Sequence, residues 1–185
     1  MGKKRISRDE IVAGGVSFLR EKGKEAWHAR ALAAWLGIST QPLFSCFSGM
    51  DELYEACLSA AAALFREAMK QEVETGKWAE YKAFGMAYIH FAAKEPKLFR
   101  LLFMEGGAED RSVGWEESVR LICSQTGVSE QKAEDFHLKM WIFVHGIATF
   151  AAQGRLSLSE EEISKAISDQ YRGLCFVMEE KNERN

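Results

Sequence analysis

Four small polar side chains near residue 40 have the types and spacing needed to read DNA: Ser39, Thr40, Gln41 and Ser45. At the start of a helix, such short side chains let the backbone come close to base edges in the major groove. Gln41 can bond both N6 and N7 of adenine, and the helix terminus attracts a phosphate. Pro42 falls in the first turn, where its missing amide costs little. The segment therefore has the chemistry of a sequence-reading helix.

Two short helices joined by a tight turn would position these side chains. The first has apolar residues at helical spacing over 29–36 and ends at Gly37. The second follows with Ser39 as its expected N-cap, and Leu43 and Phe47 hold it down. Neither helix is long enough to persist alone, so both must pack on each other and on a longer helix.

The charge of the chain is unevenly distributed. Residues 1–50 carry eight Lys or Arg and four acidic residues, a net +4, whereas residues 51–185 carry 16 basic and 23 acidic residues, a net −7. A basic segment on an acidic remainder can approach a polyanion. Because many segments of this length have a similar excess by chance, the pattern near residue 40 carries the inference.

Composition favours an all-α fold. The chain has 185 residues, of which 47% are apolar and only two are proline, and this length fits one large domain or two small ones. Its four cysteines lie far apart without a CxxC, which argues against zinc and disulfides. We find neither a secretory signal nor an apolar run of about 18 residues, so we expect a cytoplasmic protein without membrane association, metal or cofactor.

Hydrophobic periodicity and capping residues predict about nine helices. The first begins at the capping-box pair Ser7 and Glu10 and ends at Gly23. The two short helices follow it. The remaining six are expected over residues 51–74, 78–94, 98–104, 115–125, 130–153 and 160–180. Three small helices thus precede a set of longer ones.

The N-terminal residues resemble the TetR/AcrR family of transcriptional regulators. The residues that carry the likeness are Ile11, Phe18, Gly23, Leu32-Ala33, Leu36-Gly37-Ile38-Ser39, Leu43-Phe44, Phe47 and Asp51-Glu52-Leu53. Residues 141–146, WIFVHG, are similar to the Trp-x-x-x-His-Gly signature of one C-terminal subtype. The resemblance implies a DNA-binding domain at 1–50, with its helix-turn-helix at 28–47, and an effector-binding and dimerisation domain at 51–185.

Carried onto this sequence, the resemblance implies ten DNA contacts: Lys4, Arg5, His28, Arg30, Ser39, Thr40, Gln41, Pro42, Phe44 and Ser45. Three positions depart from the family pattern, because His28 replaces a capping threonine, Phe44 a tyrosine and Met50 a lysine. We expect His28 to cap its helix less well than threonine. The other two changes remove phosphate contacts, so binding should be weaker or lean on the basic residues 3–5 and on Arg30.

The resemblance also implies a small effector held among the central helices. The candidate lining residues are Met86, His90, Phe99, Phe103, Met104, Trp115, Met140 and Phe143. Effector cavities are mostly apolar with a few orienting polar groups, and His90 and His145 are the candidates for those groups. Each of these residues taken singly fits an ordinary core, so the assignment rests on the group.

Small and apolar residues in the last two expected helices let two helices approach closely, and the resemblance implies a symmetric four-helix interface between two copies. The candidate interface residues are Trp141, His145, Gly146, Phe150, Ile167, Tyr171, Leu174 and Met178. A dimer would present two DNA-reading helices about 34–36 Å apart, as a near-palindromic site requires. The alternative is that this face is buried within one copy.

These patterns together predict a ligand-responsive, dimeric transcriptional regulator, a repressor released from operator DNA by a small molecule. The helix at 51–74 would connect the effector site to the DNA-reading helices. The chain has no HExxH, GxSxG, P-loop or GxGxxG motif, which argues against an enzyme. The alternative is a helical small-molecule-binding or interaction module that no longer reads DNA.

Overall fold

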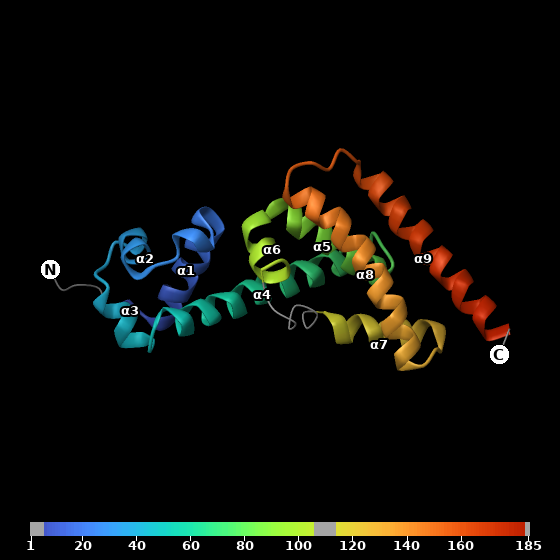
Figure 1. Cartoon of the computed structure of the whole chain (residues 1–185), viewed down its shortest axis with the longest axis horizontal. Helices are drawn as coiled ribbons and strands as arrows, with labels where there is room; N and C mark the ends of the chain where they lie inside the picture. Colours follow the sequence, from blue (N-terminus) through green and yellow to red (C-terminus); the bar gives the residue numbers. More distant parts are fainter. Residues whose placement is uncertain (1–5, 106–113, 184–185) are drawn as a thin grey trace. The chain divides into compact units, whose positions relative to one another are not determined.

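The computed structural model describes residues 6–105 and 114–183, and within these ranges the chain is built from nine α-helices and one short 3₁₀ helix, without a strand (Figure 1). The α-helices are α1 Arg8–Lys22, α2 Ala29–Leu36, α3 Gln41–Cys46, α4 Met50–Glu74, α5 Glu80–Lys94, α6 Pro96–Phe103, α7 Trp115–Thr126, α8 Glu130–Ala152 and α9 Glu160–Glu183; the 3₁₀ helix is Lys24–Ala26. The predicted all-α fold is confirmed. None of the helices in the described ranges combines the length and apolar character that a membrane crossing requires.

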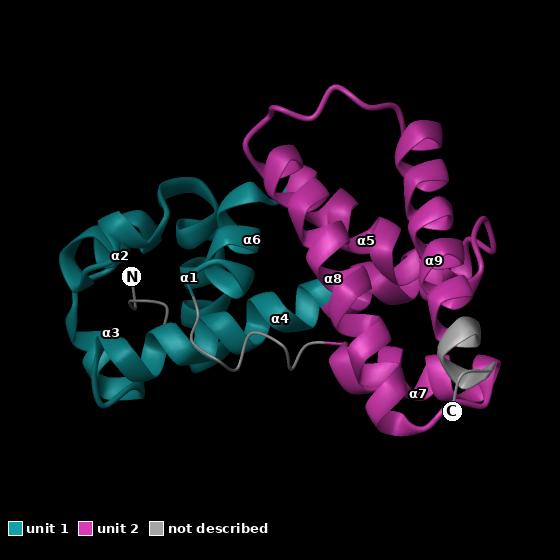
Figure 2. Cartoon of the chain, turned by 45° about the vertical axis from the view of Figure 1, so that its right-hand side comes forward, with its two compact units in different colours: residues 1–65, 95–110 teal, residues 66–94, 111–185 magenta. Residues whose placement is uncertain are grey.

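The chain forms two compact units (Figure 2). The first comprises residues 1–65 and 95–110, and the second comprises residues 66–94 and 111–185. The division falls inside α4, so this single helix contributes residues to both units. The first unit also contains α6, which is distant in sequence. The functional boundary expected at residue 50 stays a prediction.

The first unit is organised around α1, which packs against α2 and α6. The predicted capping box forms, since the Ser7 hydroxyl accepts from the Glu10 N–H at 3.1 Å and the Glu10 carboxylate accepts from the Ser7 N–H at 2.8 Å. Gly15 allows α4 to come close, because a Cβ there would lie 2.5 Å from the Cys57 sulfur. Cys57 is fully buried, and burial raises the pKa of its thiol to about 12.

Contacts with α6 complete the first unit. Arg20 of α1 donates to the Glu95 carboxylate at 2.7 Å, and the Lys97 ammonium donates to the backbone carbonyl of Glu21. The Phe103 ring packs against Phe65 of α4 with ring centres 5.0 Å apart. The helix after residue 95 therefore supports the N-terminal helices, although they are separated by more than 70 positions in sequence.

The second unit packs α5 along α8, with α7 and α9 each in contact with both. Its largest fully buried side chains include Phe136 of α8 and Met86 and Ile89 of α5. The start of α9 is fixed by a second reciprocal cap, in which Ser159 and Glu162 exchange backbone-to-side-chain bonds of 2.8 and 3.2 Å. α7 and α9 thus both pack on the pair formed by α5 and α8.

Candidate functional site

The helix-turn-helix forms where the sequence predicts it. α2 ends at Gly37, whose left-handed backbone (φ 67°) lets the Ile38 N–H bond the Ala33 carbonyl at 3.0 Å. The prediction of Ser39 as the N-cap of α3 is wrong: α3 begins later, and Thr40 occupies that position. The carbonyl of Thr40 accepts the first helical bond, from Leu43, at 3.1 Å.

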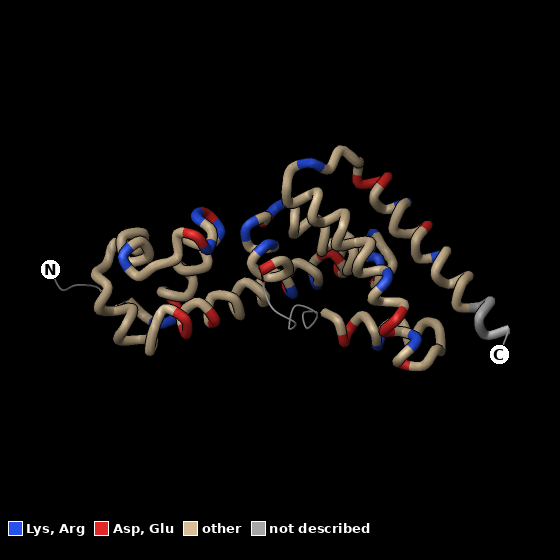
Figure 3. The backbone as a smooth tube through the Cα atoms, in the orientation of Figure 1, with Lys and Arg blue, Asp and Glu red and all other residues tan. Residues whose placement is uncertain are grey.

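α3 carries no Lys, Arg, Asp or Glu (Figure 3), and its solvent-facing side includes polar residues. Ser39, Gln41 and Ser45 are exposed, while Leu43 on the opposite face is 1% exposed and holds the helix to the unit. The Ser45 hydroxyl donates to the Gln41 carbonyl at 2.9 Å, which leaves its oxygen lone pairs as acceptors. The Gln41 amide is therefore the principal two-way hydrogen-bonding group of this face.

A hollow of about 770 Å³ runs beside this face. Its lining includes four of the predicted DNA contacts: Ser39, Gln41, Pro42 and Ser45. Ile6, which precedes α1, and Glu10 in the first turn of α1 border the same hollow. The structure thus brings the predicted base-reading residues onto one surface.

Phe44 and Arg30, two further predicted contacts, are also exposed. Phe44 is 54% exposed, so its apolar ring faces solvent. Thr40 is half-buried. The predicted contacts Lys4 and Arg5, and the neighbouring Lys3, lie outside the described residues.

His28 caps α2 despite being an unusual residue for that position. Its Nδ1 accepts from the Ala31 N–H at 3.2 Å, so the cap forms, and its strength relative to a threonine cap stays a prediction. A neutral imidazole that accepts through Nδ1 must carry its proton on Nε2. Because His28 is exposed, this Nε2–H is open to solvent as a hydrogen-bond donor.

Arg8 and Ser48 both bind Glu52 of α4, in a set of contacts that the sequence analysis missed. The Arg8 guanidinium lies 2.7 Å from the Glu52 carboxylate and 4.4 Å from the centre of the Phe47 ring. The Ser48 N–H and hydroxyl both donate to Glu52, and these bonds, with Arg8, lower the pKa of its carboxyl. The positive charge of Arg8 is thus offset in part by Glu52. The Ser48 and Glu52 pair beside the start of α4 is a partial local signal for these contacts, whereas the 44-residue separation of Arg8 and Glu52 leaves no local signal.

The predicted effector residues are divided between the two units. Phe99, Phe103 and Met104 belong to the first, where the two phenyl rings are buried and Met104 is exposed. Met86 and Met140 belong to the second and are buried in its core. These four buried side chains have the packing of ordinary core, and their role in effector binding stays a prediction.

The other three predicted effector residues also lie in the second unit and are half-buried. Trp115 packs edge-on against His137, with ring centres 4.5 Å apart, and Phe143 lies on α8. His90 forms a surface network in which Nδ1 lies 3.1 Å from the Glu72 carboxylate and Nε2 lies 3.7 Å from Glu160. His90 is thereby occupied by two acids, which leaves it poorly suited to orient a buried ligand.

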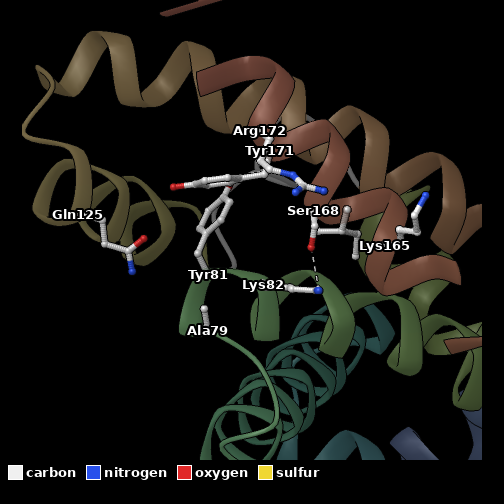
Figure 4. A pocket seen from close by; sticks show the side chains of 9 residues that line it. Ala79, Tyr81, Lys82, Gln125, Lys165, Ser168, Tyr171 and Arg172 are labelled. Atoms are coloured by element: carbon white, nitrogen blue, oxygen red, sulfur yellow. Dashed lines mark hydrogen bonds between the residues drawn. The ribbon is translucent and has the colours of Figure 1, made fainter. Parts of the chain in front are cut away.

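The second unit contains a different pocket, of about 580 Å³ (Figure 4). The beginning of α5 supplies Tyr81 and Lys82, the end of α7 supplies Gln125, and α9 supplies Ser168, Tyr171 and Arg172. Of these six, only Tyr171 was among the predicted site residues, and it was assigned to the dimer interface. The i,i+4 spacing of Ser168 and Arg172 on α9 is a signal that sequence reasoning passed over.

Tyr81 is fixed at the edge of this pocket by His137. The Tyr81 hydroxyl lies 2.9 Å from His137 Nδ1, and burial raises the pKa of Tyr81 well above its usual range. The same burial lowers the pKa of His137 from 6.5 to about 4. His137 is therefore neutral at physiological pH and able to accept a hydrogen bond from the Tyr81 hydroxyl.

This arrangement predicts an acid-sensitive second unit. The unfolded chain binds a proton on His137 below about pH 6.5, whereas the folded chain does so only near pH 4. Stability is therefore complete above pH 6.5 and falls by about 3 kcal/mol as the pH drops from 6.5 to 4. Urea unfolding across this range should show the loss in the wild type and a flatter profile in His137→Gln, whose amide oxygen still accepts from Tyr81. Parallel profiles for the two proteins would contradict the assignment.

The predicted dimer residues lie on α8 and α9, and most of them are exposed or half-buried. Gly146 is exposed and Phe150 is 54% exposed, while Trp141, His145, Leu174 and Met178 are half-buried. His145 stacks on Trp141 with ring centres 4.9 Å apart, and its Nδ1 lies 2.9 Å from the Tyr88 hydroxyl. These contacts order the exposed side of α8.

Ile167 does not fit its predicted place in the dimer interface. It is only 2% exposed, and its Cδ1 would lie 3.7 Å from a Cβ added at Gly85 of α5. Its packing is thus within one copy of the chain. Two exposed apolar residues that the prediction omitted, Ile142 and Phe176, offer more surface on the same two helices.

The fold and these surfaces define an all-helical protein with an N-terminal helix-turn-helix and a second, separately packed helical unit. Residues 81–171 match the protein family described as tetracyclin repressor-like, C-terminal domain. By this match, residues 81–171 are a C-terminal domain of the TetR-like type. The C-terminal subtype suggested by residues 141–146 stays a prediction.

Two solved structures are similar in fold. A TetR-like transcriptional regulator from Rhodococcus sp. RHA1 has a TM-score of 0.67 at 19% identity, covering 94% of this chain and 99% of its own. A TetR family transcription regulator from Marinobacter aquaeolei VT8 has a TM-score of 0.63 at 15% identity, covering 89% of this chain and 93% of its own. No curated protein matches the chain.

Proposed function

We propose that this chain is a TetR-family transcriptional regulator that binds an operator in duplex DNA through α2 and α3. The observation that carries the proposal is the exposed, uncharged polar face of α3, with Gln41 at its centre, on a turn closed by Gly37. Short polar side chains there suit direct contact with base edges, and exposed His28 and Arg30 suit the flanking phosphates. Repression by occupancy of a near-palindromic operator is the mode that the family resemblance suggests.

A selection from genomic DNA fragments tests the proposal. The purified chain should retain a small set of fragments with a shared inverted repeat, and gel shifts with competitor DNA should confirm the preference at physiological salt. Uniform, weak retention of all fragments would refute sequence reading. That result would instead favour a helical binding module that keeps the fold without the DNA-reading role.

The salt dependence of operator binding should be shallow. Phe44 has no hydroxyl, Met50 has no charge, and Arg8 is already paired with Glu52, so few side chains of the described first unit neutralise phosphates. Because the slope of log K against log salt is about −0.9 for each neutralised phosphate, we expect fewer than the 6–10 phosphates of a strongly electrostatic binder. Fluorescence anisotropy from low to high salt measures the slope. A value corresponding to 6–10 phosphates would contradict this accounting.

We further propose that the chain acts as a homodimer through α8 and α9. The exposed apolar side chains on these two helices, Ile142, Phe150, Phe176 and Val177, support a symmetric interface in which each residue occurs twice. Burial of this surface would also set the spacing of the two DNA-reading helices. A dimer of this kind matches two half-sites one helical turn apart.

A charge at Phe150 should break the dimer. In Phe150→Glu the two-fold axis places two carboxylates in an apolar interface, where unpaired charge is strongly disfavoured. Light scattering after size exclusion should give the mass of one chain for this variant at micromolar concentration. Leu64→Glu, at a similarly exposed apolar residue on α4, should keep the mass of the dimer. Equal masses for the two variants would place the interface elsewhere.

Release from the operator by a small molecule is the third part of the proposal. A ligand can shift the population of DNA-binding geometries only through unequal affinity for them, and about 5.5 kcal/mol of preference moves the ratio from 1:99 to 99:1. α4 provides a continuous path, because it is one helix with residues in both units. Constant operator affinity across a saturating screen of apolar, anionic and cationic compounds would remove this part alone.

A further inference from the structure

We infer that the pocket formed by α5, α7 and α9 binds an organic carboxylate with a flat apolar body, and that this class of compound is the effector of the regulator. The first half of the inference rests on the pocket itself. The second half rests on the proposed function. A volume of about 580 Å³ lies within the range of small-molecule sites, so a substituted aromatic acid is of suitable size.

The charged groups of the pocket are all cationic. Lys82 of α5 and Lys165 and Arg172 of α9 line it, and no carboxylate is among its lining residues within the described ranges. Asp169 on α9 engages Arg172 and lies 3.5 Å from Lys165. One carboxylate thus serves two of the three cations, which leaves the pocket with an excess of positive charge.

Lys82 is the cation best placed to receive a ligand anion. Its ammonium donates to the neutral hydroxyl of Ser168 at 2.9 Å and lies 4.6 Å from the centre of the Trp78 ring, and it has no acidic partner in the described part of the chain (Figure 4). Two effects lower the pKa of Lys82: partial burial, which is the larger, and the nearby positive charge of Arg172. A bound carboxylate would accept from Lys82 and relieve the repulsion between the two cations.

The apolar part of the ligand is defined by two tyrosine rings. Tyr81 and Tyr171 lie with ring centres 5.9 Å apart and form adjacent walls (Figure 4). The Tyr81 ring is held by the bond to His137, and Tyr171 packs edge-on against Phe136 at 5.2 Å. Because both rings are fixed before a ligand arrives, a flat apolar body can pack on them at little ordering cost.

A matched pair of probes tests the charge requirement. We would titrate the full-length protein by calorimetry with 2-naphthoate and with 2-naphthalenemethanol, which share a ring system and differ in the carboxylate. The naphthoate should bind wild type at least about tenfold more tightly, since charge-assisted bonds to Lys82 and Arg172 are made only by the anion. Equal affinity of the two probes, or no naphthoate binding up to millimolar concentration, would overturn the inference.

Three variants locate the binding. Lys82→Gln and Arg172→Gln should each weaken naphthoate about tenfold and leave the alcohol unchanged, whereas Lys70→Gln, at an exposed lysine of α4, should behave as wild type. Arg172 is largely exposed, so its substitution leaves the core intact and decides the matter if Lys82→Gln folds poorly. An equal loss in Lys70→Gln would show a non-specific charge effect and overturn the assignment.

Operator binding separates the two halves of the inference. Naphthoate that binds through Lys82 and Arg172 should also weaken operator retention of the wild type, and not of Arg172→Gln at the same concentration. Charge-dependent naphthoate binding by a protein that shows no DNA sequence preference would keep the pocket and refute the proposed regulator. Sequence-specific DNA binding without charge-dependent naphthoate binding would keep the regulator and refute the pocket.

Discussion

Gln41→Glu should lose about 100-fold in operator affinity while the fold stays intact. Gln41 is exposed on α3, so the substitution alters no packing and keeps the size of the side chain. It removes a two-way amide contact worth about 1–3 kcal/mol and adds a carboxylate facing a polyanion. Anisotropy titration with the selected operator at fixed salt measures the change.

Gln131→Glu provides the matched control for this prediction. Gln131 is an exposed glutamine on α8, in the second unit, so the same chemical change occurs away from α3. We expect its operator affinity to stay within about twofold of wild type, because the added charge is distant in sequence and screened by salt. If both variants lost affinity equally, the polar face of α3 would not be the DNA-reading surface.

Phe136→Ala should destabilise the second unit by about 3–5 kcal/mol, the typical cost of deleting a buried phenyl ring. Phe136 is 1% exposed and its ring contacts both pocket tyrosines, Tyr81 at 6.3 Å and Tyr171 at 5.2 Å between ring centres. The loss combines lost burial with the cavity left behind. Urea unfolding followed by circular dichroism would report it, and pocket binding should weaken in parallel.

Phe44→Ala removes the same ring from a different environment. Phe44 is 54% exposed on α3, so its loss should change the free energy of unfolding by no more than about 0.5 kcal/mol. Its effect should appear in DNA binding instead. A destabilisation of Phe44→Ala as large as that of Phe136→Ala would mean that the exposed ring has a packing partner outside one copy of the chain.

The helix boundaries could be predicted because their signals are local. The Ser7 and Glu10 cap, the left-handed Gly37 and the long apolar periodicity of α4 each act over a few residues, so one sequence contains all the information. The same locality explains the capping by His28. An imidazole nitrogen can accept from a nearby N–H although histidine is not among the usual capping residues.

The pocket could not be predicted because its walls are distant in sequence. Tyr81 and Tyr171 are 90 positions apart, and nothing in either helix pattern indicates that their rings meet. Periodicity marks a residue as inward-facing without distinguishing core from cavity wall, so the burial of Met86, Met140 and Phe99 leaves their predicted lining role open. Lys82 looks like an ordinary exposed lysine until Ser168 and Arg172 are placed beside it.

The packing of α6 against α1 could not be predicted for the same reason, because the residues in contact are distant in sequence. The bond from Arg20 to Glu95 spans 75 positions, and neither residue has a neighbour in sequence that predicts it. Ile167 shows the opposite case, since an apolar residue on a helix suited to dimerisation is instead covered by α5. Local pattern determines which face is apolar, and only the tertiary arrangement determines what covers it.

The enclosed sulfur of Cys57 makes the chain convenient to label. A thiol with a pKa of about 12 and no exposed surface stays protonated at neutral pH, so maleimide dyes bypass it and react with the half-buried cysteines. One of these, Cys46, is the last residue of α3. With Cys123 and Cys175 replaced by alanine, a single fluorophore at Cys46 would report DNA arrival in real time and leave Cys57 in place.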